Sequence, residues 1–523
     1  MKLRAAIAAL AIAAAAPAAA QPATFDTALQ PPPPGLTRVL IATTPGAAPG
    51  VANRLQQRGR SVSHQFTLLN LVSAEVSPDD LASLAVDPSV ANVSMDAAVV
   101  SLGVPPPPGK PAKKAAAADD APPARALTGK GVGVAVIDSG LAPNGDFSAV
   151  AFYDFTSDAG SGPYDDYGHG THVAGLIASK GALSQHAYTG IAPGVRLIAM
   201  KVLDAQGYGR TSDVIRAIEF ATLNKAALGV DIINLSLGHP IMEPAATDPL
   251  VQAVEAAVRA GIVVVVSAGN IGRNIVTGAP GYAGILSPGN APSAITVGAL
   301  DTHGTASASD DTIPSYSSRG PTWYDALVKP DLVAAGQNMV SDAAIGSALF
   351  TTYPDLQVAG NGGVNRFMRL SGTSMSAAEV TGVAALLVED AKSPGAAAIS
   401  PETIKEVLEY TALPLADVDP LTQGHGELNA AGAVTLMDAV LATGAAPAVA
   451  AQSLSSPQTT LGADTFTWSQ TVVWGNTVVW GNTVVWGNTV VWGNTVVWGN
   501  TVVWGNTVVW GNTVVWGNAD VYR

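Results

Sequence analysis

The chain has 523 residues, of which 48% are hydrophobic and only 13% are charged. This length and composition predict two to four domains with a large hydrophobic core, and they argue against a chain that is disordered throughout. A net charge of −14 argues against nucleic acid as a partner, and the lack of cysteine excludes disulfides, a cysteine nucleophile and cysteine-ligated metals.

The first twenty residues have the features of a secretory signal peptide. Lys2 and Arg4 precede an Ala/Ile/Leu-rich stretch, which ends in the small residues Ala18–Ala20. We therefore expect cleavage after Ala20 and a secreted protein, whether extracellular, at the cell surface or periplasmic. No later apolar run reaches the roughly 20 residues that cross a bilayer, so the sequence predicts no membrane span.

Changes in composition divide the chain into folded regions and linkers. The first linker is rich in Pro and Ala, and the second also contains Lys113 and Lys114, an exposed basic site that favours proteolysis. The predicted order is a signal peptide at 1–20, a linker at 21–36, a small domain at 37–102, a linker at 103–124, a large domain at 125–443, a linker at 444–470 and repeats at 471–518.

The small domain alternates short strand-like and helix-like stretches in the order β-α-β-β-α-β, which indicates an α+β fold. Ser77 followed by Pro78 is a helix-start signal for its second helix. Strands are expected at 38–42, in two runs within 61–75 and at 90–99, with helices at 52–58 and from Ser77.

The large domain alternates long apolar strands with helices. This pattern predicts an α/β fold with a mostly parallel central sheet covered by helices on both faces, and such sheets place their sites at the carboxyl ends of the strands. Strands are expected at 133–137, 196–202, 231–237 and 262–267, and helices at 169–179, 211–227 and 249–260.

The tail consists of eight consecutive TVVWGN repeats and holds eight of the ten tryptophans. Thr-Val-Val-Trp favours strand and Gly-Asn favours a two-residue turn, so a ladder of short strands or a hexapeptide solenoid is expected, with weakly ordered low-complexity chain as the alternative. Regular tryptophans would offer stacking platforms for sugars. One hypothesis is therefore a surface adhesive or carbohydrate-binding protein whose tail is the working part.

Three polar residues stand where elements of the large domain begin or end. Ser374 lies at the turn that opens an Ala/Val/Leu-rich helix, where the helix dipole and free N–H groups stabilise an anion. Asp138 closes a strand, and His169 opens a helix between two glycines. Taken singly, the serine and the aspartate have structural explanations: an N-cap serine and a helix-capping or turn aspartate.

Their chain order indicates acyl-transfer chemistry instead. Asp, His and Ser could act as orienting acid, general base and nucleophile, and Asn270, at the end of another strand, could donate to an oxyanion. A His169–His172 metal pair is a weaker alternative because it lacks a third ligand. His172 is expected to be a packed structural histidine.

With these motifs in this order, residues 126–443 resemble the subtilisin-like serine proteases, the subtilases. The resemblance rests on VAVIDSG, HGTHVAG, NLSLG, SAGN, SSRGP with KPDLVA, GTSMS and GHGELNA. It implies a serine endopeptidase in which Ser374 attacks the peptide carbonyl, His169 transfers the proton and Asp138 holds the tautomer of His169. Asn270 and the Ser374 N–H would bind the oxyanion, and no cofactor is required for this chemistry.

The resemblance also implies where protein or peptide substrates bind. Ser236, Leu237 and Gly238 correspond to the edge strand that pairs with the substrate main chain. Ser267, Ala268 and Gly269 would line one wall of the primary specificity pocket, and their small size suggests room for a large apolar side chain.

Residues 37–102 similarly resemble the family's inhibitory propeptide, which would make the chain's own N-terminal domain an intramolecular inhibitor. This predicts self-cleavage near Leu102, with Val99 filling an outer apolar subsite. A second cut at Lys113–Lys114 is the competing possibility.

The sequence departs from the family pattern beside the nucleophile. The usual proline four residues after it is Ala378, and another usual proline is Ala335. An alanine restores an N–H donor that proline lacks, so Ser374 is expected to sit slightly differently and to favour amine attack over water on the acyl-enzyme. Structural calcium is common in the family, but the sequence does not identify its ligands here. Asp158, Asp165 and Asp166 lie near a loop and are expected to be solvated surface carboxylates.

Overall fold

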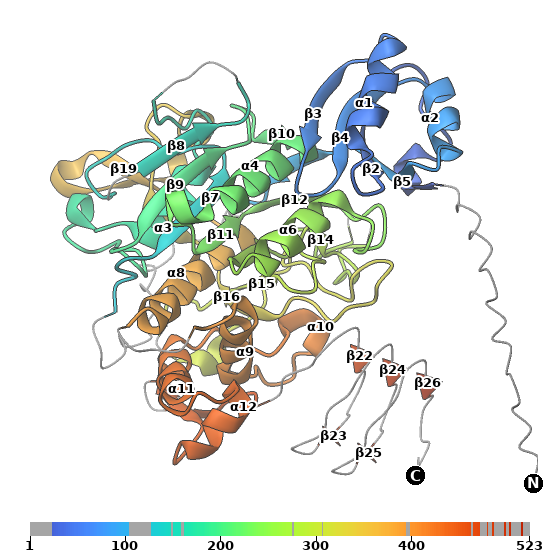
Figure 1. Ribbon diagram of the computed structural model, residues 1–523. Coiled ribbons are helices and arrows are strands. Elements are labelled where there is room, and N and C mark those ends of the chain that lie inside the picture. Colours follow the sequence, from blue (N-terminus) through green and yellow to red (C-terminus); the bar gives the residue numbers. More distant parts are fainter. Residues whose placement is uncertain are drawn as a thin grey trace, which may run out of the picture. The chain divides into compact units, whose positions relative to one another are not determined.

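The computed structural model describes residues 23–103 and 127–470, except 148–149, 158–161, 275–276, 306, 394–397 and 462–463, and five two-residue strands in the repeats (Figure 1). The expected signal peptide and the Lys113–Lys114 stretch lie outside the described residues. The chain divides into two compact units, one reaching Gln65 and including Asn70–Met95, the other comprising Phe66–Leu69 and the chain from Asp96 onward.

The first unit is an α+β domain with a mixed five-stranded sheet, as expected. The strand order is β1-β5-β2-β4-β3, with β1 parallel to β5 and β2 antiparallel to both β4 and β5. Ser77 and Asp80 form a capping box at the second helix, which explains the start predicted there. The elements are β1 (Thr24–Phe25), β2 (Thr37–Thr43), α1 (Ala48–Gln57), β3 (Val62–Phe66), β4 (Leu71–Val76), α2 (Pro78–Ala85) and β5 (Val90–Met95).

Residues 23–36 differ from the extended linker that we expected. They contribute β1 to the sheet and bury Leu29 in the core of the first unit. Asp26 accepts hydrogen bonds from the main-chain N–H groups of Leu29, at 3.0 Å, and of Met95. Long-range pairing therefore orders a proline-rich segment whose local composition favours an extended chain.

The single strand expected at 90–99 is two strands. β5 ends at Met95, and β6 (Ala98–Ser101) belongs to the second unit, where it lies between β10 (Tyr208–Arg210) and β12 (Leu237–Pro240). Between them Asp96 accepts hydrogen bonds from the Ser212 N–H at 2.8 Å and the Ser212 hydroxyl at 2.9 Å. Because Asp96 caps a distant helix, the strand is interrupted there, although the sequence of 90–99 is uniformly strand-like.

The second unit is built on a seven-stranded sheet in which every pair of neighbouring strands is parallel, which confirms the α/β expectation. The order is β16-β15-β13-β11-β7-β9-β8. The strands are β7 (Gly133–Asp138), β8 (Val150–Asp154), β9 (Arg196–Lys201), β11 (Ile232–Leu235), β13 (Val263–Ser267), β15 (Ile295–Leu300) and β16 (Leu332–Ala335).

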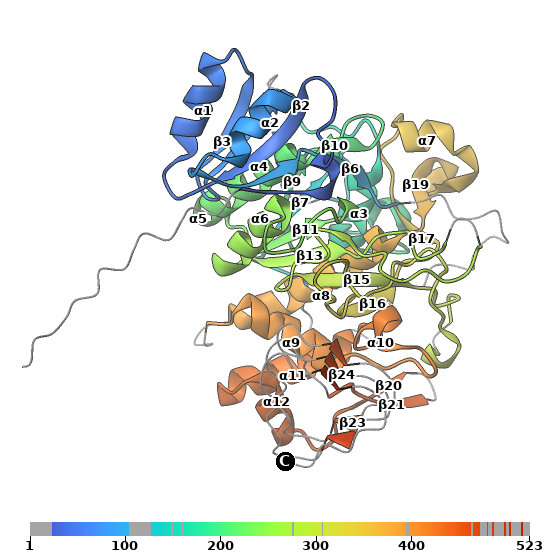
Figure 2. The same ribbon diagram turned by 90° about the vertical axis from the view of Figure 1, so that its right-hand side faces the viewer.

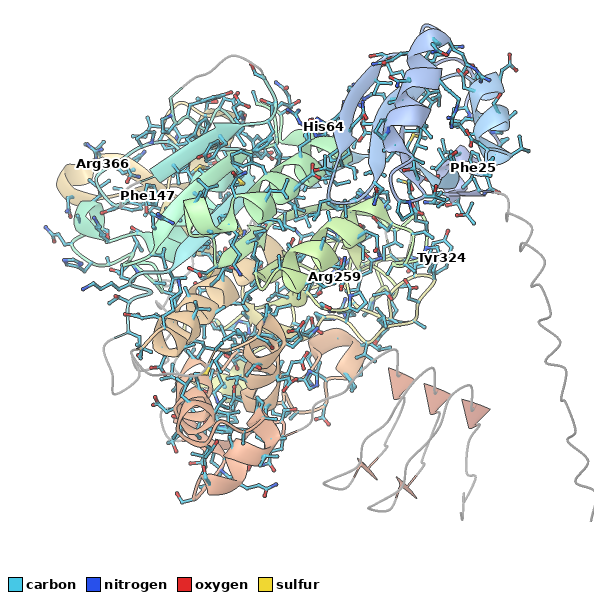
Figure 3. The ribbon with its side chains drawn as sticks, in the orientation of Figure 1. Phe25, His64, Phe147, Arg259, Tyr324 and Arg366 are labelled. Carbon is cyan, nitrogen blue, oxygen red and sulfur yellow. The ribbon has the colours of Figure 1, made fainter. Side chains whose placement is uncertain are left out.

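Helices cover both faces of this sheet (Figures 1 and 2). Val134 and Val136 point into a core shared with α3 (His169–Ala178) and α8 (Thr373–Ala391). The alternate residues of the strand point to the other face, where α4 (Thr211–Leu223) packs against α6 (Pro249–Arg259). The side chain of Arg259, which ends α6, is labelled in Figure 3.

Smaller elements surround the sheet. The Gly/Asn-rich stretch at 359–366, which had no predicted role, carries the chain between two strands of a small antiparallel sheet. The remaining elements before residue 424 are α5 (Lys225–Leu228), β14 (Leu286–Ser287), β17 (Met339–Asp342), α7 (Ala348–Thr352), β18 (Gln357–Ala359), β19 (Asn365–Leu370), α9 (Pro401–Thr411) and α10 (Pro420–Gln423).

Residues 444–470 also differ from the linker that we expected. After α11 (Ala430–Thr443) come α12 (Pro447–Ala450), β20 (Gln458–Leu461) and β21 (Asp464–Thr467). Trp468 is buried in the core of the second unit and donates its indole N–H to the Thr459 hydroxyl at 2.8 Å. Among the described residues no single helix is long and apolar enough to span a bilayer; only α11 taken together with 447–453, across a 92° bend, passes that test.

The described strands of the tail pair in parallel with a constant offset. Val478 pairs with Val496, and Val496 pairs with Val514. Val484 pairs with Val502 in a second sheet. Each offset spans three TVVWGN repeats, so identical dipeptides stack on one another.

Candidate active site

Four predicted residues lie at the ends of elements around the carboxyl edge of the sheet. Asp138 ends β7, His169 begins α3 and Ser374 is the second residue of α8. Asn270 follows β13 by three residues. Glycines with positive φ precede the two helices, Gly168 at 105° and Gly372 at 151°, a conformation that glycine adopts without strain.

Asp138 and His169 form a fully buried pair. The ring Nδ1 of His169 lies 2.8 Å from Oδ1 and 3.0 Å from Oδ2 of Asp138. An ionised carboxylate can only accept a hydrogen bond, so Nδ1 carries the hydrogen and donates it to Asp138. Nε2 is then the unprotonated ring nitrogen, which can act as the base. Among the described residues, Nε2 has no hydrogen-bond partner.

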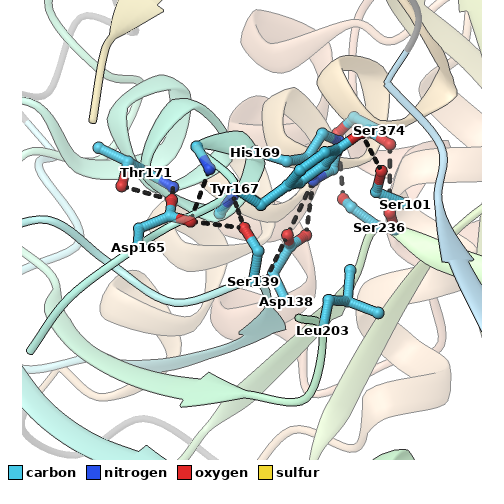
Figure 4. A network of polar contacts seen from close by, with 12 residues as sticks. Ser101, Asp138, Ser139, Asp165, Tyr167, His169, Thr171, Leu203, Ser236 and Ser374 are labelled. Carbon is cyan, nitrogen blue, oxygen red and sulfur yellow. Dashed lines mark hydrogen bonds and ion pairs between the residues drawn. The ribbon is translucent and has the colours of Figure 1, made fainter. Parts of the chain in front are cut away.

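A polar layer beneath this pair is formed by residues that our sequence reasoning did not assign (Figure 4). Asp165 accepts hydrogen bonds from the Ser139 hydroxyl at 2.9 Å, from the Gly168 N–H at 2.7 Å and from the N–H and hydroxyl of Thr171 at 2.8 and 2.6 Å. The Ser139 hydroxyl in turn accepts the Gly170 N–H at 2.9 Å. The layer therefore ties the residue after Asp138 to the first turn of α3.

The neighbouring carboxylate is also paired, contrary to the solvated loop that we expected. Asp166 forms an ion pair with the buried Lys201 at 2.6 Å. Lys201 also donates to the carbonyl groups of Ser139 and Leu203 at 2.8 and 2.6 Å. The available signals were that Ser139 lies within the VAVIDSG motif and that Asp165 and Asp166 shortly precede the HGTHVAG motif. Asp158 lies outside the described residues.

Ser374 and Asn270 are held by fewer side-chain contacts. The Ser374 hydroxyl donates to the Ser236 carbonyl at 3.2 Å, and the Ser236 hydroxyl donates to the Ser374 carbonyl at 3.2 Å. The side-chain oxygen of Asn270 accepts the N–H and hydroxyl of Thr373 at 3.1 and 3.0 Å. This arrangement leaves the Asn270 NH₂ group free to donate elsewhere.

β6 runs through the site in an extended conformation. It is antiparallel to both β10 and β12, with Val100 opposite Gly238 and Ser101 opposite Leu237. The Leu102 N–H donates to the Ser236 carbonyl at 3.2 Å. The side chains of Val99 and Leu102 are buried.

The Leu102–Gly103 peptide bond lies among the four predicted residues. The Leu102 carbonyl accepts a hydrogen bond from Nδ2 of Asn270. A Cβ on Gly103 would be 2.8 Å from Nε2 of His169, so the Gly103 backbone lies directly against the basic nitrogen. A Cβ on Gly372 would be 2.3 Å from the same Leu102 oxygen, which requires glycine there.

The structure adds one residue to the predicted wall of the specificity pocket and the predicted substrate-pairing strand. Ser267 and Ala268 are buried, and Gly269 follows them. A Cβ on Gly269 would lie 2.9 Å from Cγ of Leu286, and one on Gly238 would lie 3.2 Å from its Cβ. Leu286 therefore packs against the predicted pocket wall and against the predicted substrate-pairing strand. It is distant in sequence and lies in no motif, so sequence reasoning missed it.

His172 serves the fold. Its Nε2 lies 3.1 Å from the carbonyl oxygens of Met339 and Met368, and the side chain is fully buried. Burial lowers the pKa of His172 to about 3, so its ring is neutral. Among the described residues no cluster of three or more His, Asp or Glu side chains could hold a metal ion.

A parallel α/β sheet that carries an Asp–His pair, a serine at a helix start and an asparagine amide that donates to a peptide carbonyl has the arrangement of a serine endopeptidase. Residues 129–434 match the model of the subtilase family (Peptidase_S8), and the chain belongs to this family. It is 38% identical to serine protease AprX of Bacillus subtilis over 389 residues, 73% of this chain and 83% of AprX. It is 33% identical to M-protease of Shouchella clausii over 71% of this chain and 80% of that protein.

A solved structure supports the same fold. Fervidolysin from Fervidobacterium pennivorans, described as a keratinolytic enzyme related to subtilisin, superimposes with a TM-score of 0.60 and 21% sequence identity. The match covers 80% of this chain and 63% of the fervidolysin chain. At that identity the likeness concerns the fold alone.

Proposed function

We propose that this protein is a secreted serine endopeptidase that is made as a precursor and cuts its own chain between Leu102 and Gly103. The observation that carries the proposal is the position of that peptide bond. Its carbonyl oxygen accepts a hydrogen bond from Asn270, and the residue after it lies against the basic nitrogen of His169. A substrate needs these two contacts at the start of acyl transfer.

The chemistry follows from the same atoms. Ser374 Oγ attacks the Leu102 carbonyl carbon while Nε2 of His169 takes its proton, and Asn270 donates to the developing oxyanion. Collapse breaks the C–N bond, and His169 returns the proton to the Gly103 amine. Water then releases the acyl group from Ser374 by the same steps. Because the Ser374 hydroxyl donates to the Ser236 carbonyl, it must first turn toward His169.

Further contacts within the second unit support an inhibitory role for the N-terminal segment. Asp96 caps α4 through Ser212, and Glu219 of the same helix accepts the Leu68 N–H at 2.7 Å. These contacts do not involve the scissile bond, so cleavage leaves them intact. The new carboxyl end at Leu102 would then remain as a bound product that blocks other substrates.

Self-processing can be tested by expressing the full chain in three forms. Unaltered protein is expected to yield a mature form that begins at Gly103, whereas Ser374→Ala should keep its N-terminal domain covalently attached. Ser376→Ala, which removes another buried hydroxyl of α8, is the matched control and should be processed. N-terminal sequencing is the measurement. A start after Lys114 would reveal a second cut, and a start upstream of residue 90 would contradict the proposal.

Activity on other proteins needs a separate measurement. The mature form should degrade a denatured protein, and a serine-directed covalent inhibitor should abolish this while modifying Ser374. Mass spectrometry of the products would define the cleavage sites. The same expression experiment tests secretion. Export should remove the predicted signal peptide, and protein retained in the cytoplasm would contradict secretion.

The repeat tail supports a second, compatible function in surface or polysaccharide binding. Because the described valines pair in parallel at offsets of three repeats, equivalent residues of repeats three apart fall into register. Protein lacking residues 471–518 should then bind cell walls or insoluble polysaccharide more weakly than the full chain, with equal peptidase activity. Unchanged binding would remove this role.

A further inference from the structure

Tyr167 lies at the site but takes no part in the proton transfers. It precedes α3 by two residues, and its carbonyl accepts the Leu349 N–H at 3.0 Å. The centre of its ring is 6.5 Å from that of His169, with the planes tilted by 38°. A Cβ on Gly207 would lie 2.5 Å from Cζ of Tyr167, so the ring packs closely on the backbone at that glycine.

The ring position is fixed with respect to the residue before Leu102. The Ser101 N–H donates to the Gly207 carbonyl at 3.1 Å, so one backbone segment contacts both Tyr167 and Ser101. The Ser101 hydroxyl donates to the Tyr167 hydroxyl oxygen at 3.2 Å (Figure 4). Tyr167 is half-buried, and burial raises the pKa of its phenol, so it stays protonated at neutral pH.

We propose that Tyr167 is a specificity-determining residue, whose hydroxyl selects a serine at the position before the residue that contributes the scissile carbonyl. The inference rests on the proposed function, because it treats 98–102 as a bound substrate. A serine hydroxyl satisfies the partly buried phenol, whereas an alanine leaves that polar group without its partner. The preferred substrates are therefore peptides with Ser next to an apolar residue such as Leu.

Paired peptide substrates test this preference on the mature enzyme. The peptides Val-Val-Ser-Leu and Val-Val-Ala-Leu, each carrying a chromogenic leaving group after Leu, differ by one hydroxyl. One neutral hydrogen bond should favour the Ser peptide by about two- to tenfold in kcat/KM. Tyr167→Phe should bring the Ser/Ala ratio close to one. Tyr353→Phe, which removes the hydroxyl of another tyrosine near Tyr167, should keep the ratio of the unaltered enzyme.

Self-processing of the precursor offers a second readout. Ser101→Ala and Tyr167→Phe should each slow the appearance of the Gly103 terminus by about two- to tenfold, and the double variant should be no slower than either single variant. Additive losses would contradict a direct contact between the two side chains.

The possible outcomes separate this inference from the proposed function. Cleavage of both peptides at equal rates, or a ratio that survives Tyr167→Phe, overturns the role of Tyr167 and leaves the peptidase intact. Failure to cleave either peptide, together with unprocessed precursor, overturns the proposed function and the inference with it.

Discussion

Asp138 and His169 rest on a layer of paired polar groups, whereas Ser374 has few side-chain contacts. Asp165 alone accepts four hydrogen bonds below the Asp–His pair. The Ser374 hydroxyl makes one 3.2 Å contact, with the Ser236 carbonyl. His169 is thus fixed in advance, while the Ser374 hydroxyl must turn to reach it. Changes on the two sides should accordingly have different kinetic signatures.

The largest effect among these tests is expected on the serine side, at the oxyanion donor. Asn270→Ala removes the group that donates to the Leu102 carbonyl and should lower kcat by about 10²–10³-fold, the range known for the same change in a subtilisin. KM should change little, because the hydrogen bond strengthens as the oxyanion forms. Steady-state kinetics on a peptide substrate measures both constants. A loss confined to KM would contradict the assignment.

A smaller effect is expected from the layer below His169. Asp165→Asn turns one acceptor oxygen into a donor that faces N–H and hydroxyl groups, so the Ser139 turn and the start of α3 should shift. Since misplacement by about 1 Å can cost 10²-fold, kcat should fall by up to that factor. Asp154→Asn, at the end of the edge strand β8, is the control and should retain activity. Equal losses in both variants would indicate general destabilisation.

Ala378 allows a subtler test of the serine side. In an α-helix each N–H pairs with the carbonyl four residues earlier, so the Ala378 N–H pairs with the Ser374 carbonyl. Ala378→Pro removes this donor and should lower the ratio of aminolysis to hydrolysis of the acyl-enzyme several-fold. Ala378→Gly keeps the amide and should keep the ratio. Product analysis with an added amine nucleophile measures it, and an unchanged ratio in the proline variant would dispose of the idea.

On the Asp–His side, the buried carboxyl group of Asp342 destabilises the folded chain when it is ionised. Its replacement should change stability and leave catalysis almost unchanged. Asp342 of β17 is buried beside α3 and accepts the Asn144 amide at 2.9 Å. Burial, with the Asp146 carboxylate nearby, raises the pKa of Asp342 to about 7 from an ordinary value of 3.8. Between these two values the unfolded chain loses the proton that the folded chain retains. The free energy of unfolding should therefore fall as pH rises through this window.

Asp342→Asn removes this dependence and keeps an acceptor for Asn144. At pH 8 it should raise the free energy of unfolding by on the order of a few kcal/mol, with little gain at pH 4. Denaturant unfolding in a Ser374→Ala background avoids autolysis. Asp355→Asn, an exposed carboxylate, is the control. A gain of the same size at both pH values would contradict titration as the cause.

Much of the second unit follows from local sequence. Apolar runs and capping signals placed β7, β9, β13, α3 and α6 within one or two residues of their observed bounds. The order of motifs led to Asp138, His169, Asn270 and Ser374, which the structure gathers around one peptide bond. Sequence periodicity and short motifs predict these features because helix and strand formation depends on neighbouring residues and on the one buried face of each element.

Only the tertiary structure decided which residues distant in sequence pack against or pair with these elements. Leu29 and Trp468 lie in segments whose composition favours linkers, yet each is buried by contacts made far along the chain. Asp96 breaks a continuous strand because its partner, Ser212, lies in the first turn of a remote helix. No local pattern encodes a pairing across a hundred or more residues.

The same division holds at the site. The sequence by itself determined the residue types of the proton relay and that a serine would stand at the start of α8. The tertiary structure decided that Asp165 supports the Asp138–His169 pair, that Leu286 packs against the predicted pocket wall and substrate-pairing strand, and that Tyr167 contacts Ser101. The first set follows from short-range geometry in the chain, and the second from packing, which brings together side chains that share no local signal.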